Sequence, residues 1–250
     1  MDKCWASKFS KCSNKISKEH LISNGIFEQK DIYVEGFPWC IDGFKKISVA
    51  SLTAKILCTR HNSELSPIDI EGINAVRIFE ELLIPELRTV KTPPINKSID
   101  GYLFERWLLK VALNVSFKSG FHIGVGMGES EVGKPSPYLL AVIFGELNLS
   151  HSMGLYTLEN STPIFCKKSE ISIAPIHKNR VIGGFLFNIR GVNFFLSLFP
   201  GSPVPSLRSL GLDENFGLHP ELLNSEPKYR LSTLDVKELN REVMKVNFSW

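Results

Sequence analysis

The part of the chain that most constrains its fold and chemistry is Ile56-Leu57-Cys58-Thr59-Arg60-His61-Asn62. On a helical turn, Cys58 and His61 lie three positions apart and therefore share a face. A thiolate and an imidazole are zinc ligands, and a structural zinc ion takes four such ligands. Asn62 is turned about 100° round the helix from His61 and is expected to point into a different site. We predict a short helix over Thr53–Leu65 that carries Cys58.

The remaining zinc ligands have to come from the cysteines upstream. The chain has 5 cysteines, and this odd number favours metal ligation or free thiols over a disulfide framework. Cys4 and Cys12 are the natural second pair, but their spacing is wider than in a zinc knuckle, so Cys40 stays open as a substitute for either. The alternative is that these thiols are simply small buried hydrophobes, as we expect for Cys166 on a strand.

A second pattern is the acidic-histidine pair Glu19-His20. Taken in order, Cys4 and Cys12, then Glu19-His20, then Leu57–Asn62 resemble the signature of HNH endonucleases, the ββα-metal or His-Me finger family. The resemblance covers roughly residues 4–65. It departs from the family pattern in the Cys4-to-Cys12 spacing and in His61, which stands where a second cysteine is commoner. The long gap between His20 and Asn62 implies an insertion around Glu28–Cys40.

The resemblance implies specific roles for these residues. Glu19 and Asn62 would hold one catalytic Mg²⁺ or Mn²⁺ ion, and His20 would act as general base on the attacking water. Because neighbouring residues of a strand point to opposite faces, Glu19 and His20 can cooperate only at a strand end or bend, which we predict here. The structural zinc would be bound by Cys4, Cys12, Cys58 and His61.

Lysines are concentrated at the N-terminus, although the net charge of the whole chain is only +3. Beside a phosphodiester site, four of them could neutralise backbone phosphates without reading sequence: Lys8, Lys11, Lys15 and Lys18. The alternative is an ordinary solvated surface.

The pattern along the chain predicts an α+β protein with three regions: an HNH-like zinc domain over residues 1–87, a linker over 88–98 and an accessory domain over 99–250. Ser66-Pro67 begins one helix and Ile99–Phe117 forms another. Glu105, Arg106 and Lys110 are expected on the surface of that second helix, with contacts to the nuclease domain or to nucleic acid as the alternative. The accessory domain is predicted to have a mostly antiparallel sheet, with strands at Phe121–Val125, Leu139–Phe144, Glu170–Ala174, Val181–Ile189 and Asn193–Pro200.

Composition limits the class of protein. Among 250 residues, 43% are hydrophobic and 22% are charged, which excludes disorder and fibrous repeats as the main organisation. No apolar run is long enough to span a bilayer and no secretory signal begins the chain, so we expect a soluble, cytoplasmic protein without a membrane partner. Gly128–Lys134 has P-loop spacing, but Pro135 stands where Ser or Thr should contact Mg²⁺, so nucleotide binding is not expected.

The sequence therefore predicts a zinc-stabilised, metal-dependent endonuclease with DNA as the expected substrate and a bacterial or phage defence role by analogy. The accessory domain would recognise a target, bind a partner protein or mediate self-association. The alternative functions are a non-catalytic zinc module that binds nucleic acid or protein, and an accessory domain that is itself the functional half.

Overall fold

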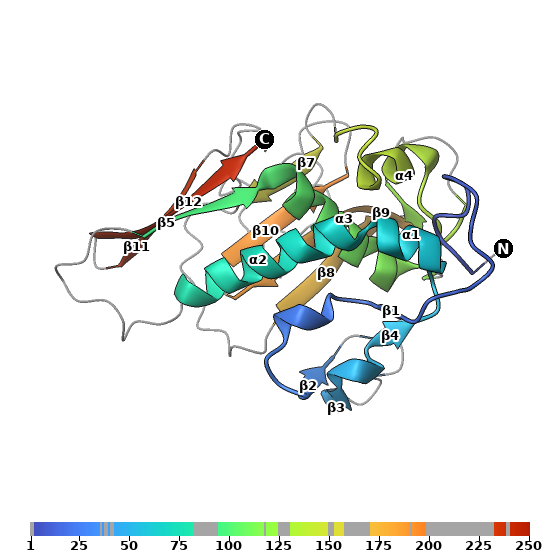
Figure 1. Ribbon diagram of the computed structural model, residues 1–250, viewed down its shortest axis with the longest axis horizontal. Helices are drawn as coiled ribbons and strands as arrows, with labels where there is room; N and C mark the ends of the chain where they lie inside the picture. The colour runs from blue at the N-terminus through green and yellow to red at the C-terminus, as the bar shows by residue number, and fades with distance from the viewer. Residues whose placement is uncertain are drawn as a thin grey trace.

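The computed structural model describes residues 3–35, 37, 40, 43–82, 95–117, 119–124, 131–149, 153–157, 171–190, 192–198, 233–238 and 241–250. These residues form a mixed α+β structure (Figure 1), as predicted. None of the described helices is both long and apolar enough to cross a membrane. Cys166, most of the predicted linker and part of Gly128–Lys134 lie outside the described residues.

The N-terminal third is built from short elements. Strand β1 (Glu19–His20) pairs antiparallel with β4 (Thr53–Ala54), which brings His20 opposite Thr53. The chain between them contains a second antiparallel pair and two 3-10 turns: β2 (Asp31–Val34), β3 (Lys45–Ser48), η1 (Asn24–Ile26) and η2 (Val49–Ser51). Of these elements, only β2 lies within the predicted insertion, Glu28–Cys40.

Helix α1 (Thr59–Glu64) begins later than predicted. The prediction of a helix from Thr53 was wrong because Thr53 is held in β4 by its pairing with β1. Cys58 is the N-cap of α1, and its Sγ accepts a hydrogen bond from the backbone N–H of His61 at 3.5 Å. A side chain that satisfies a free N–H group in the first turn stabilises the start of a helix.

Two long helices lie across one face of the largest sheet (Figure 1). They are α2 (Ser66–Leu82) and α3 (Gly101–Ser116), and both were predicted close to these bounds. The Asp100 side chain caps α3 by accepting from the backbone N–H of Leu103 at 3.0 Å. The rings of Phe79 on α2 and Phe104 on α3 both contact Phe194 of the sheet, at centroid distances of 5.5 and 5.4 Å.

The large sheet has five strands and is mostly antiparallel, with only β6 parallel to its neighbour β9. Its strands are β6 (His122–Ile123), β7 (Gly154–Thr157), β8 (Ile171–Lys178), β9 (Val181–Ile189) and β10 (Val192–Ser197). The strand predicted at Leu139–Phe144 is instead part of helix α4 (Pro137–Ile143). Ser136 caps that helix and Pro137 occupies its first turn, and these start signals outweigh a short apolar run that suits either element.

A three-stranded sheet lies toward the end of α2 farthest from α1 (Figure 1). It contains β5 (Ile95–Asp100), β11 (Thr233–Glu238) and β12 (Arg241–Ser249), with β5 parallel to β12. Residues 95–98, predicted as the end of the linker, therefore belong to a strand. The three-region division stays a prediction, although one continuous hydrophobic core includes residues from both sides of the predicted linker.

Helix α3 is buried over most of its circumference because α2 covers one side and the large sheet the other. The expectation that Glu105 and Lys110 lie on its surface was wrong, since each is only 2% exposed. Glu105 accepts a hydrogen bond from the backbone N–H of Leu155 at 3.0 Å, while Arg106 donates to the Asn148 side chain at 2.9 Å.

The close approach of α2 to α3 predicts an unusual response to Gly72→Ala. Alanine normally stabilises a helix relative to glycine by about 1 kcal/mol. Here a Cβ at position 72 would overlap the ring of Trp107, which is 1% exposed and cannot move aside. We expect a loss of about 2 kcal/mol in the free energy of unfolding, measured by urea denaturation. Arg77→Ala on the exposed side of α2 is the control and should be close to neutral.

Candidate functional site

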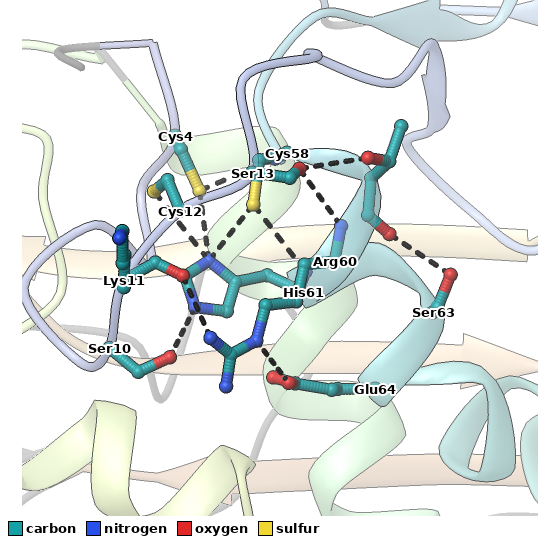
Figure 2. Close-up of polar contacts among 11 residues, drawn as sticks. Cys4, Ser10, Lys11, Cys12, Ser13, Cys58, Arg60, His61, Ser63 and Glu64 are labelled. Carbon is teal, nitrogen blue, oxygen red and sulfur yellow. Dashed lines mark hydrogen bonds and ion pairs between the residues drawn. The ribbon is translucent and has the colours of Figure 1, made fainter.

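Four side chains from distant parts of the chain converge at the start of α1. The Sγ atoms of Cys4, Cys12 and Cys58 and a ring nitrogen of His61 all lie within 4.8 Å of one another. Figure 2 shows the three thiols directed at the Nδ1 atom of His61, at 3.3 Å from Cys4, 3.9 Å from Cys12 and 3.3 Å from Cys58. All three cysteines are free, so this group could hold a metal ion.

The second ring nitrogen of His61, Nε2, also has a polar partner. Ser10 Oγ lies 2.8 Å from Nε2, on the side of the ring away from the thiols (Figure 2). A partner on one nitrogen fixes the ring orientation and leaves the other nitrogen for a metal. Burial lowers the pKa of His61, which keeps the imidazole neutral and able to act as a ligand. Phe144 packs against this ring at a centroid distance of 5.4 Å.

The three thiols differ in their acidity. Burial raises the pKa of Cys4 to about 12 and also raises that of Cys12. Burial acts in the same direction on Cys58, but hydrogen bonds involving His61 and Ser13 outweigh it and lower the pKa of Cys58 to about 7. Without a metal ion, Cys58 is therefore the thiol most readily ionised at neutral pH.

Cys40, left open as an alternative ligand, does not belong to this group. It lies between β2 and β3 in the sequence, is buried at 9% exposure and packs in the hydrophobic core. The geometry therefore favours Cys4 and Cys12 as the upstream pair, despite their wide spacing. The loop between them folds back so that both thiols reach α1.

A second group of polar side chains includes Asn62 of α1, Glu19 of β1 and Lys110 of α3. The side chain of Asn62 lies close enough to the carboxylate of Glu19 to lower its pKa, so these two predicted ion ligands are near each other. Glu19 is 5% exposed, and its Oε1 lies 2.6 Å from the Nζ of Lys110. Burial raises the pKa of Glu19, and the positive charge of Lys110 opposes that shift. The 100° turn between His61 and Asn62 separates this group from the thiols, as expected.

His20 follows Glu19 at the end of β1, where the chain leaves the strand. Burial lowers the pKa of His20, and the nearby charges of Lys110 and Lys18 lower it further. The ring is therefore neutral at pH 7. Its Nδ1 atom is buried and has no hydrogen-bond partner among the described residues. The side chain is thus in the protonation state that a general base requires.

The four predicted phosphate-binding lysines are all exposed. Lys8 forms an ion pair with Glu131 at 2.7 Å, so part of its charge is already balanced. Lys18 lies close enough to His20 to influence its pKa. The main chain of Lys11 and Lys15 is tied to α1 through bonds from Arg60 and Thr59.

Two members of the polar group, Asp69 and Lys110, were not predicted to pair with each other or with Glu19, although contact of Lys110 with the nuclease domain was the alternative to a surface position. Asp69 Oδ2 lies 2.6 Å from Lys110 Nζ, and Asp69 Oδ1 accepts from the hydroxyl of Ser23 at 2.7 Å. A signal was present, because Lys110 is three positions after Trp107 and therefore shares its buried face of the helix. A lysine on an apolar helical face indicates a buried charge partner.

No protein-family model, curated protein or solved structure matches this chain.

The assignment of the four ligands predicts how zinc binding responds to cysteine substitution. Loss of a supporting hydrogen bond typically weakens metal binding ten- to a hundredfold, so loss of a ligand, as in Cys12→Ser, should weaken zinc binding by at least about 100-fold. Cys40→Ser is the matched control and should bind zinc like the original chain. Competition with a chromophoric chelator measures both. Weak zinc binding by the Cys40 variant alone would contradict the assignment.

The unequal thiol acidities predict the number of protons that zinc displaces. At pH 8, Cys4 and Cys12 are mainly protonated, whereas Cys58, with a pKa of about 7, is mainly thiolate. Because zinc binds thiolates, uptake by the metal-free protein should release about two protons. Calorimetry in buffers of different ionisation enthalpy gives this number. A release close to zero would show that Cys4 and Cys12 are not ligands.

Proposed function

We propose that the chain is an HNH-type endonuclease that hydrolyses phosphodiester bonds of nucleic acid, with DNA as the expected substrate. What supports the proposal is the nearness of the Asn62 side chain to the Glu19 carboxylate, whose pKa it lowers, with His20 next along the strand. In this proposal β1, β4 and α1 form a ββα-metal finger.

The group of thiols and imidazole fits zinc by its chemistry. Sulfur and nitrogen donors in a closed set of four are typical of structural zinc, and all four ligand atoms are already close together. In this proposal, zinc holds the N-terminal loop against α1 and so fixes the position of Asn62, the residue that follows His61.

The oxygen donors of Glu19 and Asn62 fit a hard divalent ion, Mg²⁺ or Mn²⁺. Such an ion would supply stabilisation of the charge that develops on the phosphate and on the leaving 3′ oxygen.

The remaining chemistry belongs to His20. The neutral imidazole accepts a proton from water as the water oxygen forms a bond to phosphorus and the bond from phosphorus to the 3′ oxygen breaks. The proton stays on the ring until solvent removes it. Exposed Lys11, Lys15 and Lys18 supply a cationic surface for the backbone on either side of the bond that is cut.

A second candidate is a non-catalytic zinc module that binds nucleic acid or a protein partner. One observation favours it: Glu19 is nearly inaccessible and already paired with a lysine.

Plasmid cleavage by the zinc-loaded protein separates these candidates. With Mg²⁺ or Mn²⁺, we expect nicking that EDTA abolishes and that His20→Ala slows by about 100-fold or more, since the substitution removes the base. His177→Ala is the control, because this exposed histidine on β8 packs at a tilt against Phe121 and its loss should leave the rate unchanged. Cleavage by the His20 variant at the original rate would refute the mechanism. Absence of cleavage of both DNA and RNA would favour the binding module.

A further inference from the structure

Lys110 places an ammonium group between two carboxylates inside the protein. Its Nζ lies 2.6 Å from Glu19 Oε1 and 2.6 Å from Asp69 Oδ2, and its side chain is 2% exposed. Buried charges of this kind are stable only when they are paired. The lysine is therefore the cation that balances Glu19 in this structure.

One face of α3 holds this arrangement in place. Trp107 Nε1 donates to Ser23 Oγ at 2.9 Å, and Ser23 in turn donates to Asp69. At the other end of the face, Asn114 donates to the carbonyl oxygens of His20 and Leu21, at 3.3 and 3.4 Å. Helix α3, which belongs to the region after the predicted linker, is thus bonded to the strand that carries the predicted active site.

A divalent ion and the ammonium group would need the same carboxylate. An ion coordinated by Glu19 and Asn62 would lie within a few ångströms of Lys110 Nζ, where two positive groups shielded from water repel strongly. The two carboxylates and one ammonium have a net charge of −1, so they attract a divalent ion far less than the carboxylates would alone.

We propose that Lys110 competes with the divalent ion for Glu19, so that α3 holds the site closed until the lysine withdraws. The inference rests on the proposed ion site at Glu19 and Asn62. It makes Lys110 the residue that sets the metal affinity of that site, and it gives the region after the linker a route to control the site through the position of one side chain.

Calorimetric titration of the zinc-loaded, full-length protein with Mn²⁺ tests this without nucleic acid. Lys110→Met should lower the dissociation constant of the Glu19 site at least about tenfold, because it removes the competing charge. The gain should vanish in Lys110→Met/Glu19→Gln. The control is Lys97→Met, which breaks a more exposed ion pair with Glu81 on α2 and should bind Mn²⁺ like the original chain. Equal Mn²⁺ binding by Lys110→Met and the original chain would overturn the proposal.

Lys110→Met leaves the buried Glu19 carboxylate and the partly exposed Asp69 carboxylate unbalanced, so its fold is checked by thermal unfolding. Should it not fold, Lys110→Met/Asp69→Asn replaces it, because removing one charge of each sign keeps the group at −1. Since the net charge is then unchanged, the gain comes only from removing the ammonium that contacts Glu19, and Mn²⁺ should bind more tightly than to the original chain, though by less than to Lys110→Met. Unchanged affinity would overturn the proposal. A chain that gains Mn²⁺ binding in this way but cuts no nucleic acid would refute the nuclease proposal and leave the competition by Lys110 standing.

Discussion

Three thiols and one imidazole meet at the first turn of α1, and the arrangement of the N-terminal third depends on that meeting. The contacts join positions 57 and 49 residues apart, between Cys4 or Cys12 and His61. Among its described residues, the intervening chain contains only short strands in two-stranded pairs and 3-10 turns, and an isolated two-stranded pair is marginally stable in water. A metal ion bound by these four residues would supply the missing constraint, because closing such long loops removes much of the freedom of the unfolded chain.

The same turn links this group to the chemistry. His61 and Asn62 are neighbours in sequence but face different partners, the thiols in one case and Glu19 in the other. Whatever fixes His61 therefore also fixes Asn62. In the proposed nuclease, the structural zinc and the reacting centre would be coupled through one peptide bond, and loss of zinc would disturb the site without a direct contact.

Helix α3 connects the predicted active site to the rest of the molecule. Buried polar residues are costly in a protein interior, but Lys110 is paired with Glu19 and Asp69, Asn114 donates to the N-terminal segment, and Glu105 accepts from the backbone of β7. Such a network specifies one docking of α3 against β1 more sharply than apolar packing alone. Lys110 balances the charge of Glu19. In the proposed competition it also affects ion binding, because its ammonium contacts the carboxylate that would coordinate the ion.

Local patterns in the sequence determined the Cys/His character of the candidate metal site, the two long helices and most strands of the large sheet. These features follow from spacing, caps and periodicity within a few residues, whereas the roles expected of Glu19, His20 and Asn62 came from the resemblance to the HNH signature. Tertiary structure alone decided that Cys4 and Cys12, not Cys40, join Cys58 and His61, and that Lys110 and Asp69 surround Glu19. The reason is physical: a ligand set or a buried ion pair depends on which distant segments meet, and no local preference encodes that meeting. The short apolar run at Leu139–Phe144 shows the same limit of local sequence patterns, because its apolar residues are compatible with a strand or a helix. The Ser136 cap and Pro137 at the start favour the helix.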